Sequence, residues 1–110
     1  MHRRVDIGRK VDYKTLETAL VKAAEEVGWK AQIEDTFNRS YKLDPFQETK
    51  DYDGTMVHLR GRVFSAIKVR IPDKNPSNMF FVWQGSPNGW ASERKVQEYL
   101  GAVSRNLLNP

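Results

Sequence analysis

An alternation of residue types along residues 54–71, GTMVHLRGRVFSAIKVRI, most constrains the fold of this 110-residue chain. The odd positions are apolar or small, whereas the even positions hold most of the cations. Period-two alternation is typical of strands with one buried face. Because the stretch exceeds a usual strand, we expect either two strands joined near Gly61 or one long strand bent there. The odd residues are Val57, Leu59, Gly61, Val63, Ser65, Ile67, Val69 and Ile71, and the even ones are Met56, His58, Arg60, Arg62, Phe64, Ala66, Lys68 and Arg70.

The composition predicts one globular domain over residues 1–110. Hydrophobic residues make up 39% of the chain and charged residues 29%, a balance that favours a folded protein over a disordered one. Cysteine is absent, which excludes disulfides and thiolate chemistry. No apolar run approaches the roughly 18 residues of a membrane span. We therefore expect a cytoplasmic protein with no membrane partner.

The net charge of +4 is unevenly distributed along the chain. Residues 1–10 have a net charge of +3 and residues 54–72 a net charge of +4, whereas residues 34–53 have a net charge of −3. A basic patch favours anionic partners, nucleic acid among them. The same pattern is also consistent with a strand face that is basic for solubility alone.

Two segments, residues 12–27 and 91–108, show the spacing of amphipathic helices. Asp12 and Ser92 are natural N-caps, and Gly28 is a natural residue to follow the first helix. Apolar residues recur at spacings of three and four, so each helix has one face to bury. They are Leu16, Ala19, Leu20, Ala23, Ala24 and Val27 in the first helix, and Val96, Leu100, Val103 and Leu107 in the second.

Further strands are predicted outside the central stretch. Residues 29–37 alternate, and residues 41–46 indicate a short strand that Pro45 confines to an edge or bend. Residues 3–7 form either a short edge strand or part of a loose basic tail over residues 1–10. Residues 79–83 are apolar on both faces, so the pattern leaves open whether Phe81 and Trp83 face the core. Residues 38–40, 47–54, 72–78 and 85–90 predict turns and loops.

These elements predict an α+β fold in the order (β)-α-β-β-β-β-α. We expect a single, mostly antiparallel sheet of four to five strands, with both amphipathic helices on one face. This element order resembles one repeat of the TATA-box-binding protein fold. The resemblance implies a shape and no activity. Trp29 and Trp90 stand at helix boundaries, where we expect them to plug the core.

If the helices cover the apolar side of residues 57–71, the basic side remains an open sheet face. Its cations would neutralise phosphates and its aromatic rings would stack on bases. We therefore predict a non-enzymatic binding module for RNA or single-stranded nucleic acid. The same aromatic rings would alternatively lie in the core or form a dimer contact. The candidate site residues are His58, Arg60, Arg62, Phe64, Lys68, Arg70, Phe81 and Trp83.

No complete catalytic, metal or cofactor motif appears in the chain, so we predict no enzyme, metal or cofactor. The segment 60–64 opens like the RRM signature, but Arg62 stands where that signature has an aromatic residue. An EF-hand alignment on Gly54 fails at both ends, where it places Thr49 and Arg60. The Gly-rich phosphate loops, the nucleophile elbow and the zinc-protease helix motif are all absent.

Two other functions fit the sequence. One is a protein-interaction or homodimerisation module, in which residues 79–83 pair edge to edge or face to face with a second copy. Acidic residues 34–53 would then meet basic residues 54–72 of that copy. The other is a small-molecule or enzymatic pocket around His58.

Overall fold

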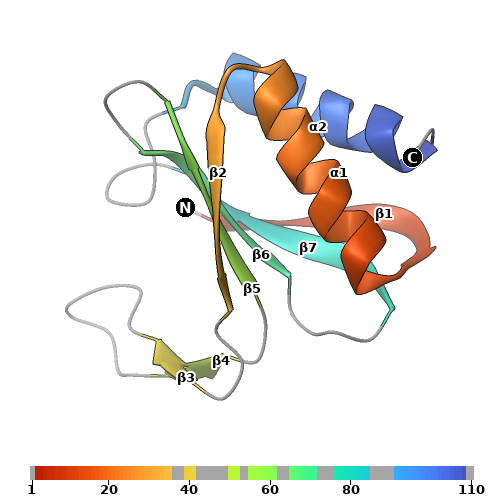
Figure 1. Cartoon of the computed structure of the whole chain (residues 1–110), viewed down its shortest axis with the longest axis vertical. Helices are drawn as coiled ribbons and strands as arrows, with labels where there is room; N and C mark the ends of the chain where they lie inside the picture. The colour runs from red at the N-terminus through yellow and green to blue at the C-terminus, as the bar shows by residue number, and fades with distance from the viewer. Residues whose placement is uncertain are drawn as a thin grey trace.

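The computed structural model describes residues 2–35, 39–41, 50–52, 55–61, 65–71, 76–84 and 91–108. They form a five-stranded sheet, a separate two-stranded sheet and two helices (Figure 1). The strands are β1 (His2–Val11), β2 (Lys30–Asp35), β3 (Arg39–Tyr41), β4 (Lys50–Tyr52), β5 (Thr55–Arg60), β6 (Ser65–Ile71) and β7 (Ser77–Trp83), and the helices are α1 (Tyr13–Glu26) and α2 (Glu93–Leu108).

The main sheet has the strand order β1-β7-β6-β5-β2, and every neighbouring pair is antiparallel. Strands β1 and β2 are therefore its edges. Both helices lie on one side of the sheet (Figure 1). Along the chain, the strands of this sheet and the helices follow the order β-α-β-β-β-β-α. The predicted α+β fold is confirmed.

The residues of the central alternation form two strands, β5 and β6, which precede and follow Gly61 in the chain and pair with each other. Five of their odd residues are buried on the helix side, as the alternation predicts; they are Val57, Leu59, Ile67, Val69 and Ile71. Ala66 is an exception, because the alternation places it on the basic side and it instead belongs to the core cluster. Arg60 pairs with Ser65 and Leu59 with Ile67, so Ala66 is the extra residue of a β-bulge.

Several boundaries differ from the predictions. Residues 3–7 do form an edge strand, but β1 is longer than predicted and continues to Val11 through Gly8, which has a φ of 90°. Residues 39–40 were expected in a turn and residues 50–52 in a loop, yet they lie in β3 and β4, which pair. These strands carry no apolar alternation that would reveal them. Phe37, Leu43, Phe46 and Trp90 lie outside the described residues.

Each helix begins at the predicted cap. The Asp12 carboxylate accepts hydrogen bonds from the backbone N–H of Thr15 at 2.8 Å and from its hydroxyl at 2.9 Å. These bonds hold the pKa of Asp12 below its ordinary value. At the start of α2, the Ser92 hydroxyl accepts from the backbone N–H of Lys95 at 3.2 Å. Gly28 follows α1 with a φ of 82°, a conformation that favours glycine.

The core lies between the helices and the sheet. Tyr99 of α2 is fully buried, and its hydroxyl donates to the Leu20 carbonyl of α1 at 3.0 Å. Burial raises the pKa of Tyr99. The ring of Trp29 packs 5.4 Å from that of Tyr99, which confirms Trp29 as a core residue. Small buried residues of α1 leave room for this close packing; they are Ala19, Ala23 and Ala24.

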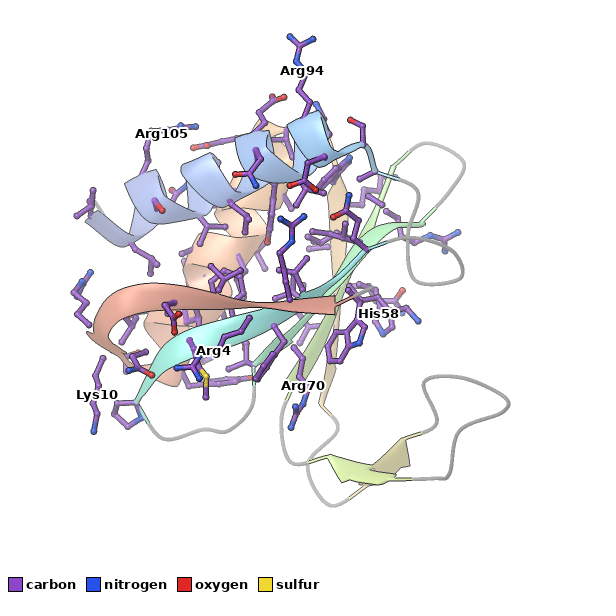
Figure 2. All side chains as sticks on the ribbon, turned by 180° about the vertical axis from the view of Figure 1, so that it is seen from behind. Arg4, Lys10, His58, Arg70, Arg94 and Arg105 are labelled. Carbon is purple, nitrogen blue, oxygen red and sulfur yellow. The ribbon has the colours of Figure 1, made fainter. Side chains whose placement is uncertain are left out.

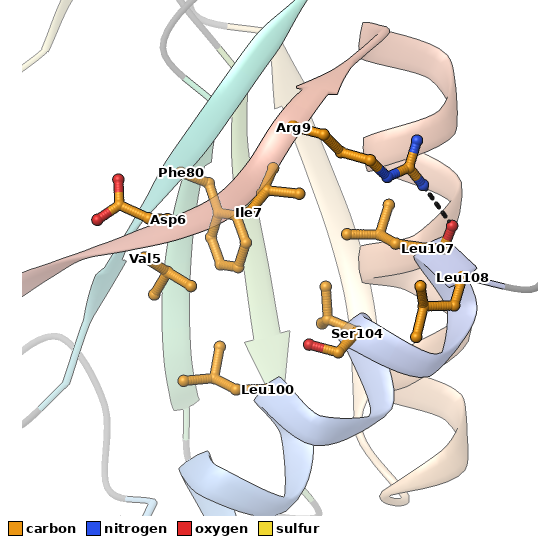
Figure 3. Close-up of a pocket in the computed structure, with 10 residues that line it drawn as sticks. Val5, Asp6, Ile7, Arg9, Phe80, Leu100, Ser104, Leu107 and Leu108 are labelled. Atoms are coloured by element: carbon orange, nitrogen blue, oxygen red, sulfur yellow. Dashed lines mark hydrogen bonds between the residues drawn. The ribbon is translucent and has the colours of Figure 1, made fainter.

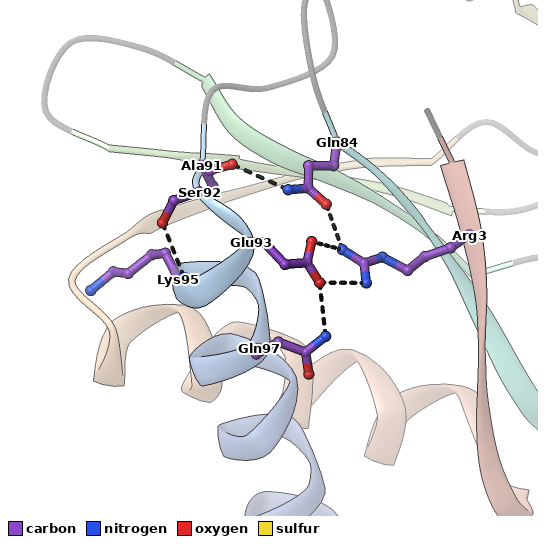
Figure 4. Close-up of polar contacts among 7 residues, drawn as sticks. All are labelled: Arg3, Gln84, Ala91, Ser92, Glu93, Lys95 and Gln97. Carbon is purple, nitrogen blue, oxygen red and sulfur yellow. Dashed lines mark hydrogen bonds and ion pairs between the residues drawn. The ribbon is translucent and has the colours of Figure 1, made fainter.

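Two arginines fasten β1 to opposite ends of α2. Arg3 pairs with the Glu93 carboxylate at 2.6 Å and also donates to Gln84 at 2.5 Å (Figure 4). Its hydrogen bonds lower the pKa of Glu93 to about 2. At the other end, Arg9 donates to the Leu107 carbonyl at 2.6 Å (Figure 3). Both pairs have the polarity that the helix dipole favours, since the acid lies at the N-terminus and the cation at the C-terminus.

Candidate functional site

The register of the strands decides which way Phe81 and Trp83 face. Residues directly opposite each other in an antiparallel pair project to the same side of the sheet. Trp83 lies opposite Lys68 and Phe81 opposite Arg70, while His58 lies opposite Lys68. All five therefore share the side away from the helices, which we call the open face. In Figure 2, Arg4 and Arg70 lie on the side of the sheet away from α2.

The open face is organised in rows that cross the strands. One row runs through Gln32, His58, Lys68 and Trp83, on β2, β5, β6 and β7. A second runs through Arg70, Phe81 and Arg4, on β6, β7 and β1. At one corner, Lys30 of β2 lies opposite Arg60 of β5. Neighbouring rows on one face are about 7 Å apart and neighbouring strands about 4.8 Å.

The described side chains of this face are strongly basic. The permanently charged groups are five cations, Arg4, Lys30, Arg60, Lys68 and Arg70, against one acid, Asp6. Asp6 pairs with Arg4 on the same strand at 2.8 Å. Among the described residues, no carboxylate forms an ion pair with Lys30, Arg60 or Lys68. The face therefore presents positive charge that the described part of the chain does not neutralise.

The aromatic part of the face is smaller than the sequence indicates. The Arg70 guanidinium carbon lies 5.7 Å from the centroid of the Phe81 ring, within range of a cation–π interaction. Phe81 remains partly accessible, whereas Trp83 exposes only 8% of its surface. Trp83 thus forms the floor of the face rather than an exposed stacking surface. Arg62 and Phe64 lie outside the described residues.

Sequence reasoning missed three side chains of the face that carry hydrogen-bond donors: Arg4, Lys30 and Gln32. The alternation of residues 29–37 places Lys30 and Gln32 on a polar face, which is the signal that could have identified them. Their place beside Arg60 and His58 depends on the pairing of β2 with β5. Strand pairing is a long-range property that the local pattern does not specify.

Described residues line three cavities that have neither His58 nor a tryptophan among those lining residues. One of about 210 Å³ lies between β1 and α2, where Val5, Ile7 and Leu100 are among its lining residues (Figure 3). A second of about 200 Å³ lies between the two helices. The third, of about 500 Å³, lies at the β2–β5 corner of the sheet. Within the described parts of the chain, no group of three His, Asp or Glu residues is placed to hold a metal ion.

Edge-to-edge pairing of two copies through residues 79–83 is excluded by the topology. Strand β7 lies between β1 and β6, so both of its edges are already hydrogen-bonded. The outer edges of the sheet belong to β1 and β2 instead.

Comparison of the chain with protein-family models, curated proteins and solved structures finds no significant match. The likeness to one repeat of the TATA-box-binding protein fold is therefore one of element order alone. Within the described residues, neither α1 nor α2 is long and apolar enough to cross a bilayer.

Proposed function

We propose that the protein binds nucleic acid, as RNA or single strands, through the open face. The observation that supports this proposal best is the cross-strand register, which collects five cations and Phe81 on the side that the helices leave uncovered. The cations neutralise phosphates, and Phe81 with the Arg70 guanidinium above it offers a surface on which a base stacks. The role is binding and not catalysis.

The chemistry of the face favours single strands over duplex DNA. The major groove of B-DNA admits a helix or a two-stranded ribbon, and a five-stranded sheet is too broad to enter it. A single strand exposes its phosphates and the π-faces of its bases together. A face that combines cations with an aromatic ring meets both groups at once.

The test is a triple variant, Arg60→Gln, Lys68→Gln and Arg70→Gln, titrated into a fluorescent 20-nucleotide RNA while anisotropy is followed. We expect affinity to fall by at least a factor of 100 at low salt. Each phosphate that the variant no longer neutralises also removes about 0.7 from the slope of log K against log salt. The slope should therefore flatten by roughly 2.

The matched control removes the same charge from the helix side, as Lys14→Gln, Lys22→Gln and Arg94→Gln. These three side chains are exposed on α1 and α2. We expect this variant to keep most of the affinity, because its change in net charge is equal but its position differs. If the wild type binds no RNA or single-stranded DNA at low salt, or if both variants lose affinity equally, the proposal is wrong.

A further inference from the structure

The β2–β5 corner of the sheet contains a pair of like charges. Lys30 and Arg60 lie directly opposite each other and both are exposed. Like charges at directly opposed positions destabilise a sheet. In the described part of the chain, no acid forms an ion pair with either cation. A local rule of sheet stability is thus broken without a compensating ion pair among the described residues, and such exceptions are expected at functional sites.

A cavity of about 500 Å³ lies at this corner, lined by Lys30, Ala31, Gln32, Arg60 and Gly61. Gln32 stands two residues beyond Lys30, so its carboxamide lies on the same face. Lys30, Gln32 and Arg60 together bring an ammonium, an amide NH₂ and a guanidinium to one place. Gly61 has no side chain to fill the space beside them. We call the three donors the phosphate seat.

We propose that the phosphate seat binds a phosphate group of the bound nucleic acid, an inference that rests on the proposed function. An anion between the two cations replaces their repulsion with two attractions. Phosphate fits this donor set better than a carboxylate does. A terminal phosphate has three non-bridging oxygens, so a bidentate guanidinium leaves one for the ammonium, and any of the three can accept a further hydrogen bond from the amide. An internal phosphate has two non-bridging oxygens, each of which accepts more than one hydrogen bond, so the three donors share them. The phosphate is either internal to the strand or terminal, and free phosphate shares the same chemistry.

The first experiment uses inorganic phosphate alone. It is titrated into the ¹⁵N-labelled protein at constant ionic strength, so that screening does not change, and amide shifts are recorded. We expect saturable shifts at Lys30, Gln32, Arg60 and Gly61. The variant Lys30→Gln with Arg60→Gln should weaken this binding at least about tenfold, because it removes charge-assisted hydrogen bonds. The variant Lys22→Gln with Arg94→Gln removes the same charge and should bind as the wild type does. An absence of saturable shifts at the corner in the wild type would overturn the proposal.

The second experiment identifies the source of the phosphate. Two RNAs of one sequence, with a 5′-phosphate and with a 5′-hydroxyl, are titrated into the wild type and the double variant. If the wild type binds the 5′-phosphate RNA more tightly than the 5′-hydroxyl RNA and the double variant does not, the seat binds a terminal phosphate. Equal affinities that fall together in the double variant assign an internal one. Saturable phosphate shifts without any RNA binding support the seat with free phosphate as its ligand, and overturn the nucleic-acid function. RNA binding that the double variant leaves intact overturns the seat and not the wider function.

Discussion

The two faces of the five-stranded sheet come from the same strands but follow different physical rules. On the helix side, the central residues of β5, β6 and β7 are at most 1% exposed. On the open face, the neighbouring residues of those strands are charged or partly accessible, except Trp83, which is 8% exposed. Phe80 and Phe81 show the contrast most clearly. They are adjacent in sequence, but Phe80 is 1% exposed whereas Phe81 is partly exposed. Packing against the helices restricts the residue types on the helix side, whereas the residues of the open face are not restricted in this way and are accessible to a ligand.

The largest expected effect compares these two phenylalanines. Phe80→Ala should lower the free energy of unfolding by about 3–5 kcal/mol, because it opens a cavity in the core. Phe81→Ala should cost only about 1 kcal/mol, chiefly the interaction with Arg70. Urea unfolding followed by circular dichroism measures both values. Equal losses for the two variants would contradict the distinction between the faces.

The same pair also separates stability from binding. Phe81→Ala should weaken RNA binding by about 1–3 kcal/mol if a base stacks on the ring. Phe81→Tyr keeps an aromatic ring and is the matched control, which should retain the affinity. Unchanged affinity in Phe81→Ala would remove Phe81 from the proposed interface.

A smaller effect tests the polar interaction inside the core. Tyr99→Phe removes the hydroxyl that donates to the Leu20 carbonyl and should lower the free energy of unfolding by about 1 kcal/mol. Gln32→Ala on the exposed side is the control, and it should change stability by less than about 0.5 kcal/mol. Equal effects would show that burial does not strengthen this hydrogen bond.

The Arg3–Glu93 pair predicts a pH dependence of stability. The pKa of Glu93 falls from 4.5 to about 2 in the folded protein, so its stabilisation is present above pH 4.5 and is lost as pH falls toward 2. The effect should be small, because the Glu93 side chain is 56% exposed. Wild type should melt above Glu93→Gln at pH 5, and the difference in melting temperature should shrink by pH 2. A difference that does not change with pH would exclude this linkage.

The smallest expected effect has the opposite sign. Lys30→Gln removes the like-charge repulsion with Arg60 and should raise the free energy of unfolding by about 0.3 kcal/mol at low salt. For a domain of this size that is roughly 1–2 °C in melting temperature, measured by calorimetry. Lys22→Gln on α1 is the control. If the variant is more stable but binds phosphate more weakly, the repulsion between Lys30 and Arg60 lowers stability and is retained because it serves binding.

Local pattern was sufficient for much of the fold. The alternation of residues 54–71 specified β5, β6 and their buried side, and Asp12 and Ser92 marked the starts of the helices. The pattern failed where its signal was absent. Strands β3 and β4 have no apolar alternation, and the bulge at Ala66 shifts a register that strict alternation assumes constant.

The candidate site was less predictable, because it depends on pairing between distant strands. Residues 79–83 are apolar on both faces, so only their register with β6 places Phe81 and Trp83 beside the cations. That Lys30 lies opposite Arg60 follows only from the pairing of β2 with β5. The near-complete burial of Trp83 depends on its surroundings in three dimensions, which no local period describes.

The two fastenings of β1 to α2 have a consequence for folding kinetics. They join residues 90 and 98 positions apart in the chain, and β1 also pairs with β7. Loop-closure entropy must be overcome before such distant residues meet. Topologies rich in non-local pairs fold over milliseconds to seconds rather than microseconds. We therefore expect β1 to dock late, after β5, β6 and β7 have paired. In a chain that lacks α2, we expect β1 to lack both of these contacts, so that this edge of the sheet is less firmly held.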